Sequence, residues 1–348
     1  DLMNRKDEHV SLAKAFHKPR LNDFDAVQII HQSFPEIDSA QVTLETELFG
    51  RSFATPFFIN AMTGGSEKSK KINQDLAEVA KACDLMMATG SVSAALKDPA
   101  LSDTFQVVRQ VNPEGFLLAN VGAGSSVENA LRAIDLFEAD ALQIHLNAPQ
   151  ELVMPEGDRE FSNWLSLLEQ IVKAAPVPVV VKEVGFGMTR ETIQQLISVG
   201  VQTIDVAGSG GTSFTQIENA RRKKREMAYL NHFGQSTVIS LLEANEVQHS
   251  FTTIASGGIR DAFDIFKALC LGAKSVGISA TILTMLLDKG PEETIATIQS
   301  WKEQLQLLYT MVGQTRTQDL TNVSLIFSGS VKDWCHARHI SLSDYSFR

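Results

Sequence analysis

Cysteine is scarce in this chain of 348 residues. The three cysteines are Cys83, Cys270 and Cys335, which lie far apart and form no C-x-x-C pair. An odd, scattered set of this kind predicts neither a disulfide framework nor a zinc site. It is typical of proteins in a reducing compartment, so we expect a cytoplasmic protein.

Basic residues are also fewer than acidic residues in this chain. Lys and Arg together number 31 and Asp and Glu number 41, which gives a net charge of −10 at pH 7. This balance disfavours a general affinity for nucleic acids or anionic membranes, because both are polyanions. An anionic small molecule would need positive charge that is concentrated at one place in the fold.

Long apolar runs are missing as well. No run reaches the ~18 residues expected of a membrane span, and no signal peptide is visible, so we expect no membrane association. The chain begins with Asp1 rather than Met, and we expect a few residues to precede it. Hydrophobic residues nonetheless make up 44% of the chain, which is enough for a sizeable core.

The chain instead shows a regular alternation of short apolar runs and longer amphipathic segments. Alternating strands and helices predict a parallel sheet, and eight such units predict an α/β fold of the (β/α)8 TIM-barrel type. A doubly wound sheet is the alternative, but the first run lacks the G-x-G-x-x-G turn. The eight expected strands lie within residues 57–65, 85–91, 116–122, 141–147, 177–185, 203–211, 253–259 and 275–280.

We expect one domain, with an N-terminal arm at 1–50, the barrel over about 55–285, and a C-terminal helix and tail at 291–348. The tail is expected to begin with one long amphipathic helix and to end irregularly. Apolar residues within 66–83 recur at helical spacing, which predicts a helix there.

Two further segments carry helix signals. The segment before Gly272, a helix-stop residue, places Phe263, Phe266 and Cys270 on one side of a helix. The long connection 212–235 contains the basic run Arg221–Arg225, which we expect to form a solvated helix face. A mobile lid or a subunit contact is the alternative for this connection.

Polar side chains collect where the run 141–147 ends. Gln143, His145 and Asn147 lie two residues apart and therefore share one face of a strand, and Gln150 and Glu151 follow at once. Ordinary satisfied core groups would explain His145 alone. Burial of the whole set at a strand end is costly without a function, and in a barrel this end carries the active site.

Glycines collect after the late strands. The segments GSGGT (208–212), SGGI (256–259) and ISA (278–280) expose backbone N–H groups, and the helices that follow add positive dipole ends. A single glycine after a strand is often only a turn. Three adjacent loops of this kind predict a phosphate site.

Lys182 ends the apolar run PVPVVVK. A lysine in such a run is costly unless it is paired, so a salt bridge with a neighbouring acid is one interpretation. The other is a cation that faces developing negative charge, such as the N1–C2=O edge of a reduced flavin. Ser91, Thr63 and Asn120 could then bind the polar edge of the ring. Together with the phosphate loops, these residues predict an FMN site.

The segment NRKDEHV places Arg5 and Lys6 side by side. Adjacent side chains splay apart on a helix, whereas in an extended arm both can clamp an anion. An exposed tail is the alternative, which composition alone favours for residues near a terminus.

Taken together, these motifs resemble the type 2 isopentenyl diphosphate isomerases, which are FMN-dependent TIM-barrel enzymes. QIHLNAPQE followed by VVVKEVGFG is the most specific part, because other FMN barrels keep the glycine loops without that pair. The matching segments run through most of the chain in family order and are NRKDEH, INAMTGGS, ATGS, ANVGAG, QIHLNAPQE, VVVKEVGFG, DVAGSGGTSF, ASGGIR and GISA.

The resemblance implies roles for individual residues and replaces the exposed-tail interpretation of the Arg-Lys pair. The implied substrate-side residues are Arg5 and Lys6 on the diphosphate, Ser91 and Ser93 beside it, Glu151 on Mg²⁺, and His145, Asn147, Gln150 and Lys182 in catalysis. The implied FMN contacts are Ala61, Met62, Thr63, Gly64, Ser91, Asn120, Lys182, Thr212, Gly257, Gly258, Arg260, Ser279 and Ala280.

One position departs from the family pattern. Gln-Arg is expected after the serine, in GSQRAAL, whereas this chain has Val92 and Ser93 in GSVSAAL. An arginine there would help to hold the diphosphate, and Ser93 cannot replace its charge. Either another cation replaces the missing charge, or the affinity for the diphosphate is weaker, or the enzyme uses a different substrate.

The implied reaction interconverts isopentenyl and dimethylallyl diphosphate with no net redox change. A proton is added at C4 and another is removed from C2, with reduced FMN as the acid–base group, NADPH as its reductant and Mg²⁺ on the diphosphate. The resemblance also implies a homo-oligomer, a tetramer or larger.

Two alternatives from other classes stay open. An FMN-dependent 2-hydroxy-acid oxidase would share the barrel and the glycine loops, but it needs a His base beside a late Arg, and Arg260 has no such His near it in the sequence. A non-enzymatic flavin-storage role would leave QIHLNAPQE unexplained.

Overall fold

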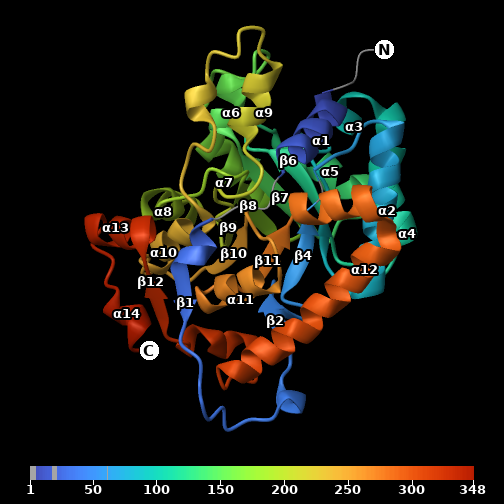
Figure 1. Ribbon diagram of the computed structural model, residues 1–348. Coiled ribbons are helices and arrows are strands. Elements are labelled where there is room, and N and C mark those ends of the chain that lie inside the picture. The colour runs from blue at the N-terminus through green and yellow to red at the C-terminus, as the bar shows by residue number, and fades with distance from the viewer. Residues whose placement is uncertain (1–4, 18–21, 61) are drawn as a thin grey trace.

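A computed structural model describes residues 5–17, 22–60 and 62–348 of the chain. Among these residues, eight parallel strands close into a barrel in the order β10-β11-β4-β5-β6-β7-β8-β9 (Figure 1). The predicted TIM barrel is thus confirmed, and the open doubly wound sheet is excluded. The strands are β4 (Phe57–Asn60), β5 (Met87–Ala88), β6 (Leu117–Gly122), β7 (Ala141–Leu146), β8 (Val179–Glu183), β9 (Thr203–Asp205), β10 (Thr252–Ser256) and β11 (Ser275–Ile278).

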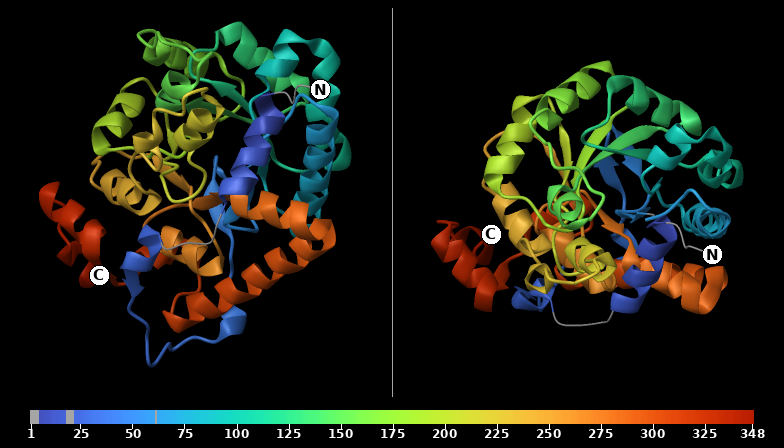
Figure 2. Two further views of the ribbon diagram at one scale, coloured as in Figure 1. Left: turned by 45° about the horizontal axis from the view of Figure 1, so that its top comes forward. Right: turned by 90° about the horizontal axis from the view of Figure 1, so that it is seen from above.

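Helices follow the strands along the chain and surround the barrel, as the view from above in Figure 2 shows. In the first of them, the apolar residues at helical spacing are buried against the barrel, as predicted. The helices are α2 (Glu67–Cys83), α3 (Ser93–Lys97), α4 (Asp103–Val111), α5 (Val127–Leu136), α6 (Ala148–Val153), α7 (Trp164–Ala174), α8 (Arg190–Ser198), α9 (Phe214–Arg221), α10 (Thr237–Asn245), α11 (Ala262–Cys270) and α12 (Ala280–Met311).

Helix α11 corrects one prediction about its apolar side. Phe266 and Cys270 are fully buried, but Phe263 is 44% exposed. Phe263 lies in the first turn of the helix, and its ring centre is 4.2 Å from the Nζ of Lys267. Helical spacing predicts which side chains lie on one side of the helix, but it does not predict how much of that side the neighbouring elements cover.

The C-terminal part is more regular than predicted. The long helix expected from 291 is confirmed as the second part of α12, which also has a first part from Ala280 and is interrupted at Gly290, whose φ is +85°. The expected irregular end is wrong. It contains β12 (Leu325–Phe327), which pairs antiparallel with β1 (Val27–Ile29), and the helices α13 (Gly329–Ala337) and α14 (Ser343–Ser346).

The N-terminal residues that the structure describes form helix α1 (Arg5–Phe16) rather than an extended arm. It contacts α2, α9 and α12, and it lies beside the end of the barrel at which the strands finish (Figure 2). Its buried residues are His9, Val10 and Ala13, which is little apolar surface for a helix of 12 residues.

The opposite end of the barrel is closed by apolar packing. The hairpin of β2 (Thr46–Leu48) and β3 (Arg51–Phe53) packs against Phe58 and other buried residues inside the barrel. The guanidinium of Arg51 lies 5.4 Å from the ring centre of Phe53 and 5.2 Å from that of Phe116. This closure leaves the carboxyl ends of the strands as the open end of the barrel.

No helix within the described ranges combines the length and the apolar character that crossing a membrane requires.

Candidate active site

The carboxyl ends of the strands open into a cavity of about 1220 Å³. Pockets for one small ligand usually measure ~300–1000 Å³, so the space suits a cofactor together with a substrate. The predicted site residues that line it are Arg5, Lys6, Met62, Ser91, Ser93, Asn120, His145, Asn147, Gln150, Glu151, Lys182, Thr212, Gly257, Gly258, Arg260, Ser279 and Ala280.

Three predicted cofactor residues differ from this set. Ala61 lies outside the residues that the structure describes. Thr63 and Gly64 are buried and are not among the lining residues. A Cβ on Gly64 would lie 2.0 Å from the ring of Phe105, so this glycine permits close packing behind the loop. The Nδ2 of Asn73 donates to the carbonyl of Thr63 at 3.2 Å and holds the loop in place.

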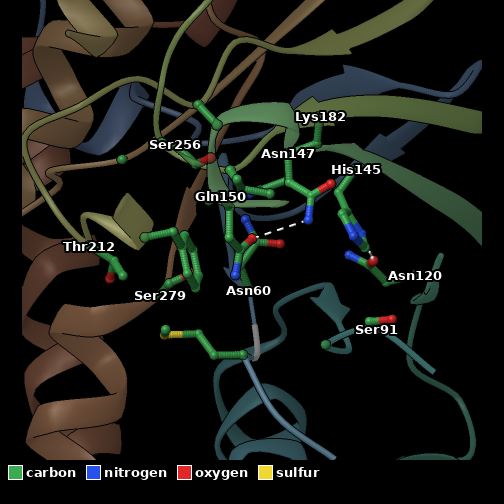
Figure 3. Close-up of a pocket in the computed structure, with 18 of the residues that line it drawn as sticks. Asn60, Ser91, Asn120, His145, Asn147, Gln150, Lys182, Thr212, Ser256 and Ser279 are labelled. Carbon is green, nitrogen blue, oxygen red and sulfur yellow. Dashed lines mark hydrogen bonds between the residues drawn. The ribbon is translucent and has the colours of Figure 1, made fainter. Parts of the chain in front are cut away.

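A chain of amides crosses the floor of the cavity. His145 Nδ1 lies 2.6 Å from Asn120 Oδ1 (Figure 3). Asn120 Nδ2 donates to Gln143 Oε1 at 2.6 Å, and Gln143 Nε2 donates to Asn60 Oδ1 at 3.4 Å. The strands β6 and β7 place Asn120 opposite Gln143 in register. The direction of this chain makes His145 Nδ1 the donor, which leaves Nε2 as an acceptor.

His145 is held in its neutral form. Burial lowers its pKa to about 3, and the charges of Lys6, Lys182 and Arg5 act in the same direction. Its Nε2 is adjacent to Gly122, where a Cβ would lie 3.3 Å away. A neutral imidazole with a free Nε2 lone pair can accept a hydrogen bond without adding charge to the site.

Gln150 is fixed from both sides. It lies on α6, which begins after Asn147 with Pro149 in its first turn. Its Nε2 donates to Glu218 Oε1 at 3.1 Å, and its Oε1 accepts from Asn147 Nδ2 at 3.2 Å. The amide of Gln150 therefore has one defined orientation towards the cavity.

Glu218 on α9 is fully buried and gathers several partners. Its Oε1 is 2.7 Å from His9 Nε2, and its Oε2 accepts from Arg221. Burial would raise the pKa of Glu218, but the contacts to His9, Gln150 and Arg221 hold it below its usual value. The carboxylate is therefore charged and ties α1, α6 and α9 together above the cavity.

This network corrects the prediction for the basic run. Helix α9 ends at Arg221, so residues 221–225 do not form one helix face. The side chain of Arg221 is only 15% exposed and forms ion pairs with Glu8, Glu156 and Glu218. The expected solvated face is wrong for Arg221, because Glu218 of its own helix and acids from two other segments converge on it.

Arg5 and Lys6 reach the cavity from the first turn of α1, although they do not lie on an extended arm. Arg5 Nη1 is 3.5 Å from the sulfur of Met154. Burial and the neighbouring Arg5 lower the pKa of Lys6 to about 8, while Glu218 and Glu151 counteract this. Both cations therefore reach the cavity from one helical turn.

Glu151 also lines the cavity. Its Oε1 accepts from Asn147 Nδ2 at 3.2 Å, and its Oε2 accepts from the backbone N–H of Asp158 at 2.8 Å. Within the described ranges, no group of three His, Cys, Asp or Glu side chains could hold a metal ion. A Mg²⁺ ion at Glu151 would therefore need phosphate oxygens and water to complete its coordination, as is common for this ion.

The ammonium of Lys182 forms a hydrogen bond to a backbone carbonyl, and its acidic neighbour Asp205 lies on the next strand. Its Nζ donates to the carbonyl of Glu183 at 2.9 Å, and Asp205 lies opposite it in register on β9. Burial lowers the pKa of Lys182 and raises that of Asp205, and each charge favours the other. In the part of the chain that the structure describes, no ion pair of Lys182 within 4.0 Å is found, which leaves its ammonium available to the cavity.

The late glycine loops are in backbone contact with each other. Gly257 and Gly258 have φ values of +98° and +76°, and a Cβ on Gly257 would lie 2.1 Å from the oxygen of Gly208. Asn60 Nδ2 and Thr212 Oγ1 are also buried, and neither has a hydrogen-bond partner among the residues that the structure describes. Unpartnered polar atoms beside a glycine-lined wall match a ligand with a phosphate and a polar ring edge.

Arg260 is part of an ion-pair cluster. Its guanidinium donates to both carboxylate oxygens of Asp25 at 2.8 and 2.9 Å and to Asp264 at 2.8 Å. Asn22 Nδ2 donates to the carbonyl of Gly258 at 2.9 Å. Arg260 thus fastens the segment at 22–26 over the glycine loops.

Sequence reasoning missed Asn60, His9 and Glu218 as site residues. Asn60 is a polar residue at the end of an apolar strand, which is the signal that identified Lys182. His9 was visible only as part of NRKDEH. Glu218 carried no signal, because its partners lie far away in the sequence.

Similarity to known proteins covers nearly the whole chain. The model of the FMN-dependent dehydrogenase family matches residues 139–326. An isopentenyl-diphosphate delta-isomerase of Latilactobacillus sakei subsp. sakei is 51% identical over 340 residues, which cover 97% of each chain. Proteins of the same name are 48% identical in Listeria welshimeri, over 97% of this chain and 95% of the relative, and 44% identical in Staphylococcus epidermidis, over 97% of each.

Solved structures resemble the fold at much lower identity. The flavin-binding domain of baker's yeast flavocytochrome b2 matches with a TM-score of 0.67 and 16% identity over 90% of this chain and 81% of that chain. Mandelate oxidase with 2-hydroxy-phenylacetamide matches with a TM-score of 0.62 and 16% identity over 92% and 91%. At this identity the likeness shows the fold alone.

Proposed function

The chain belongs to the isopentenyl-diphosphate delta-isomerases, within the wider FMN-dependent dehydrogenase family, and from this premise we propose how its cavity performs the reaction. The substrates are isopentenyl and dimethylallyl diphosphate, with FMN and Mg²⁺ as the bound groups. One observation carries the proposal. A single cavity joins the glycine loops to Arg5, Lys6, Gln150 and Glu151.

The residues present fit FMN. The glycine loops after β9 and β10 would hold the phosphate, and within the described ranges Asn60 and Thr212 have buried polar atoms that lack partners. Lys182 would face the N1–C2=O edge of the ring and stabilise its reduced, anionic form. Bound FMN in its reduced form supplies an acid–base group and an electron-rich ring, and NADPH is the proposed reductant.

The diphosphate would be held at the opposite side of the cavity by Arg5, Lys6 and Glu151. The two cations bind phosphate oxygens directly, Arg5 as a fork and Lys6 as a point charge. Glu151 would bind Mg²⁺, whose other ligands are phosphate oxygens and water. This arrangement fixes the charged end of the substrate and leaves the isoprene end to reach the centre of the barrel.

The chain's own residues then orient the alkene. Gln150 presents an amide of fixed orientation to the isoprene unit, because Glu218 and Asn147 hold its two ends. His145 keeps a free Nε2 lone pair in a neutral ring, so it can accept a hydrogen bond without adding a positive charge that would oppose the one at C3.

No specific observation favours the oxidase alternative. The solved 2-hydroxy-acid enzymes share only the fold at 16% identity, and Arg260 is bound by Asp25 and Asp264.

The protein is also proposed to act as a cytoplasmic homo-oligomer, a tetramer or larger, in a single domain. Its cysteines are free and buried, as suits a reducing compartment. Exposed apolar side chains such as Phe34, Tyr229 and Phe347 offer surface for subunit contacts. Light scattering of the purified protein tests the assembly.

The proposed function is tested by anaerobic conversion of isopentenyl diphosphate by FMN-loaded protein with Mg²⁺, with and without NADPH. We expect dimethylallyl diphosphate only after reduction of the flavin, and no stoichiometric consumption of NADPH. Product formation with oxidised flavin would contradict the role of the reduced cofactor. Flavin that binds and is reduced without any product would contradict the isomerase mechanism.

A further inference from the structure

One wall of the cavity carries positive charge that the proposed function does not use. This wall, here named the α3–α5 wall, is formed by α3, α5 and the loops before them. Its polar members include Ser91, Ser93, Lys97, Ser126, Asn129 and Arg132. The side chains of Lys97 and Arg132 are exposed at the rim.

The two cations of this wall lack acidic partners. Within residues 5–17, 22–60 and 62–348, the ion pairs found do not include Lys97 or Arg132. The acidic residues that line the cavity all lie on other segments and are Asp25, Glu151, Glu156, Asp158, Asp261 and Asp264. In a chain with a net charge of −10, two unneutralised cations at a cavity rim create a local site for an anion.

Arg132 is held in place by neutral groups. Its Nη2 donates to the carbonyl of Leu96 at 2.9 Å, and its Nη1 donates to Asn129 Oδ1 at 3.1 Å. A guanidinium has five N–H groups, so these two bonds fix its position and leave three donors for a ligand. Arg316, by contrast, is paired with Asp319 outside the cavity.

The hydrogen bond to Leu96 joins Arg132 to the helix that begins at Ser93. Leu96 lies one helical turn after Ser93 on α3, which corresponds to ~5 Å along the axis. Ser91 Oγ and Ser93 Oγ are 3.1 Å apart at the start of this turn. Two hydroxyls and a guanidinium therefore face one part of the cavity, a combination suited to the several oxygens of a phosphate group.

We propose that Arg132 is a further substrate-binding residue, which binds the terminal phosphate of the diphosphate together with Ser91 and Ser93. Arg5 and Lys6 bind from α1, and Arg132 binds from the facing wall, so the diphosphate is clamped between two elements. Lys97 adds charge at the rim. Arg132, on α5, thus provides the positive charge of the arginine that the family pattern has at position 93, where this chain has a serine on α3. The inference rests on the proposed function, since it assumes a diphosphate substrate.

The test is steady-state kinetics of Arg132→Gln on the FMN-loaded enzyme with Mg²⁺. We expect the KM for isopentenyl diphosphate to rise by about 10-fold, because a hydrogen bond to a charged group is lost, with kcat changed less than twofold. Arg132→Lys keeps the charge without the fork and is expected to have an intermediate KM. Arg316→Gln removes the same charge far from the cavity and is expected to behave as wild type.

Isopentenyl monophosphate shows which phosphate is bound. Arg132→Gln is expected to lower the preference for the diphosphate over the monophosphate by about 10-fold, because only the diphosphate has the terminal group. An equal loss with both compounds would overturn the assignment to the terminal phosphate. An unchanged KM for the diphosphate in Arg132→Gln would overturn the proposal as a whole.

Flavin reduction by NADPH distinguishes substrate binding at this wall from reductant binding. If the KM for NADPH rises in Arg132→Gln while that for isopentenyl diphosphate does not, the wall binds the reductant's phosphate and the proposal is wrong. Arg132 is exposed, so we expect unchanged FMN content and melting temperature in the variants. A wild-type protein that forms no dimethylallyl diphosphate would contradict the proposed function itself, whereas an active wild type with an unaffected Arg132→Gln variant would contradict only this inference.

Discussion

Glu218 is the residue on which the contacts of the substrate side converge. It is fully buried and holds Gln150, His9 and Arg221 through one carboxylate. A buried carboxylate with three partners is costly to disturb, because the loss of its charge leaves those partners without their acceptor. The role of Glu218 is therefore to position the amide of Gln150.

Replacing Glu218 with Gln tests this role. The substitution keeps the shape but lets the new amide donate, so the Gln150 amide is no longer fixed. We expect kcat to fall by about 10- to 100-fold with little change in FMN affinity. Glu226→Gln is the matched control, because Glu226 is an exposed acid that pairs only with Arg222. Equal kcat values for Glu218→Gln and wild type would show that the orientation of Gln150 does not limit turnover.

Glu151 is expected to determine the need for Mg²⁺. In Glu151→Gln, the contact from the Asp158 N–H can persist, but the charged ligand is lost. We expect the Mg²⁺ concentration at half-maximal rate to rise by about 10-fold, with FMN binding intact. Titration of activity with Mg²⁺ measures this. Glu156→Gln, in the loop that follows α6, is the control, and an unchanged requirement in Glu151→Gln would remove Glu151 from the metal site.

His145 gives the protein a pH dependence of stability with a defined sign. Its folded-state pKa of about 3 lies below the 6.5 of an ordinary histidine, so the unfolded chain binds more protons between these values. The contribution is complete above pH 6.5 and is lost as the pH falls towards 3. From pH 8 to pH 5 we expect it to decrease the free energy of unfolding by about 2 kcal/mol.

Urea unfolding of wild type and His145→Asn at pH 8 and pH 5 measures that contribution. The difference between the two pH values should be about 2 kcal/mol smaller in the variant. His249→Asn changes an exposed histidine and should keep the wild-type difference. A His145→Asn variant with the same pH dependence as wild type would mean that the imidazole is not held neutral by the fold.

At the level of elements, the break in α12 shows how one residue redirects a helix. Gly290 has φ +85° and ψ 173°, and Pro291 follows it. A Cβ at Gly290 would meet nothing within 4 Å, so only the backbone conformation requires glycine there. Side chains other than glycine rarely adopt this region of φ and ψ.

Gly290→Ala should therefore destabilise the protein without affecting the chemistry. We expect a decrease of about 1–3 kcal/mol in the free energy of unfolding, and an unchanged kcat. Lys289→Ala, at an exposed neighbouring position, is the control. A Gly290→Ala protein as stable as wild type would show that α12 can straighten at no cost.

The helices and strands that could be predicted are those with a clear pattern of apolar residues in the sequence. Each barrel strand is an apolar run that ends in polar or glycine residues. Seven of the eight strands lie within the expected runs, and β10 begins at Thr252, one residue before its run at 253–259. Helix α1 was not predicted, because it is attached to the barrel by ion pairs such as Glu8–Arg221 and has no apolar stripe that the sequence would show. The pairing of β1 with β12 also escaped, because strands of three residues carry too little alternation to recognise.

For the whole molecule, the closed barrel explains why so many site residues were predictable. Once a run is recognised as a strand, its last residues are brought to one end of the barrel whatever their neighbours are. His145, Lys182 and Asn120 were found in this way. Glu218 and Arg132 lie on helices outside the strand ends, and only the packing of those helices brings them to the cavity.

The contact between α1 and α9 has a consequence for the order of assembly during synthesis. Glu8 and Arg221 are 213 residues apart in the chain. At translation rates of about 5–20 residues per second, α1 leaves the ribosome roughly 10–40 s before its partner exists. Contacts between such distant residues also slow folding. Until then Arg5 and Lys6, the proposed diphosphate cations of α1, lie on a chain that lacks α9, and a chain arrested before residue 218 would carry them without Glu218 and Arg221.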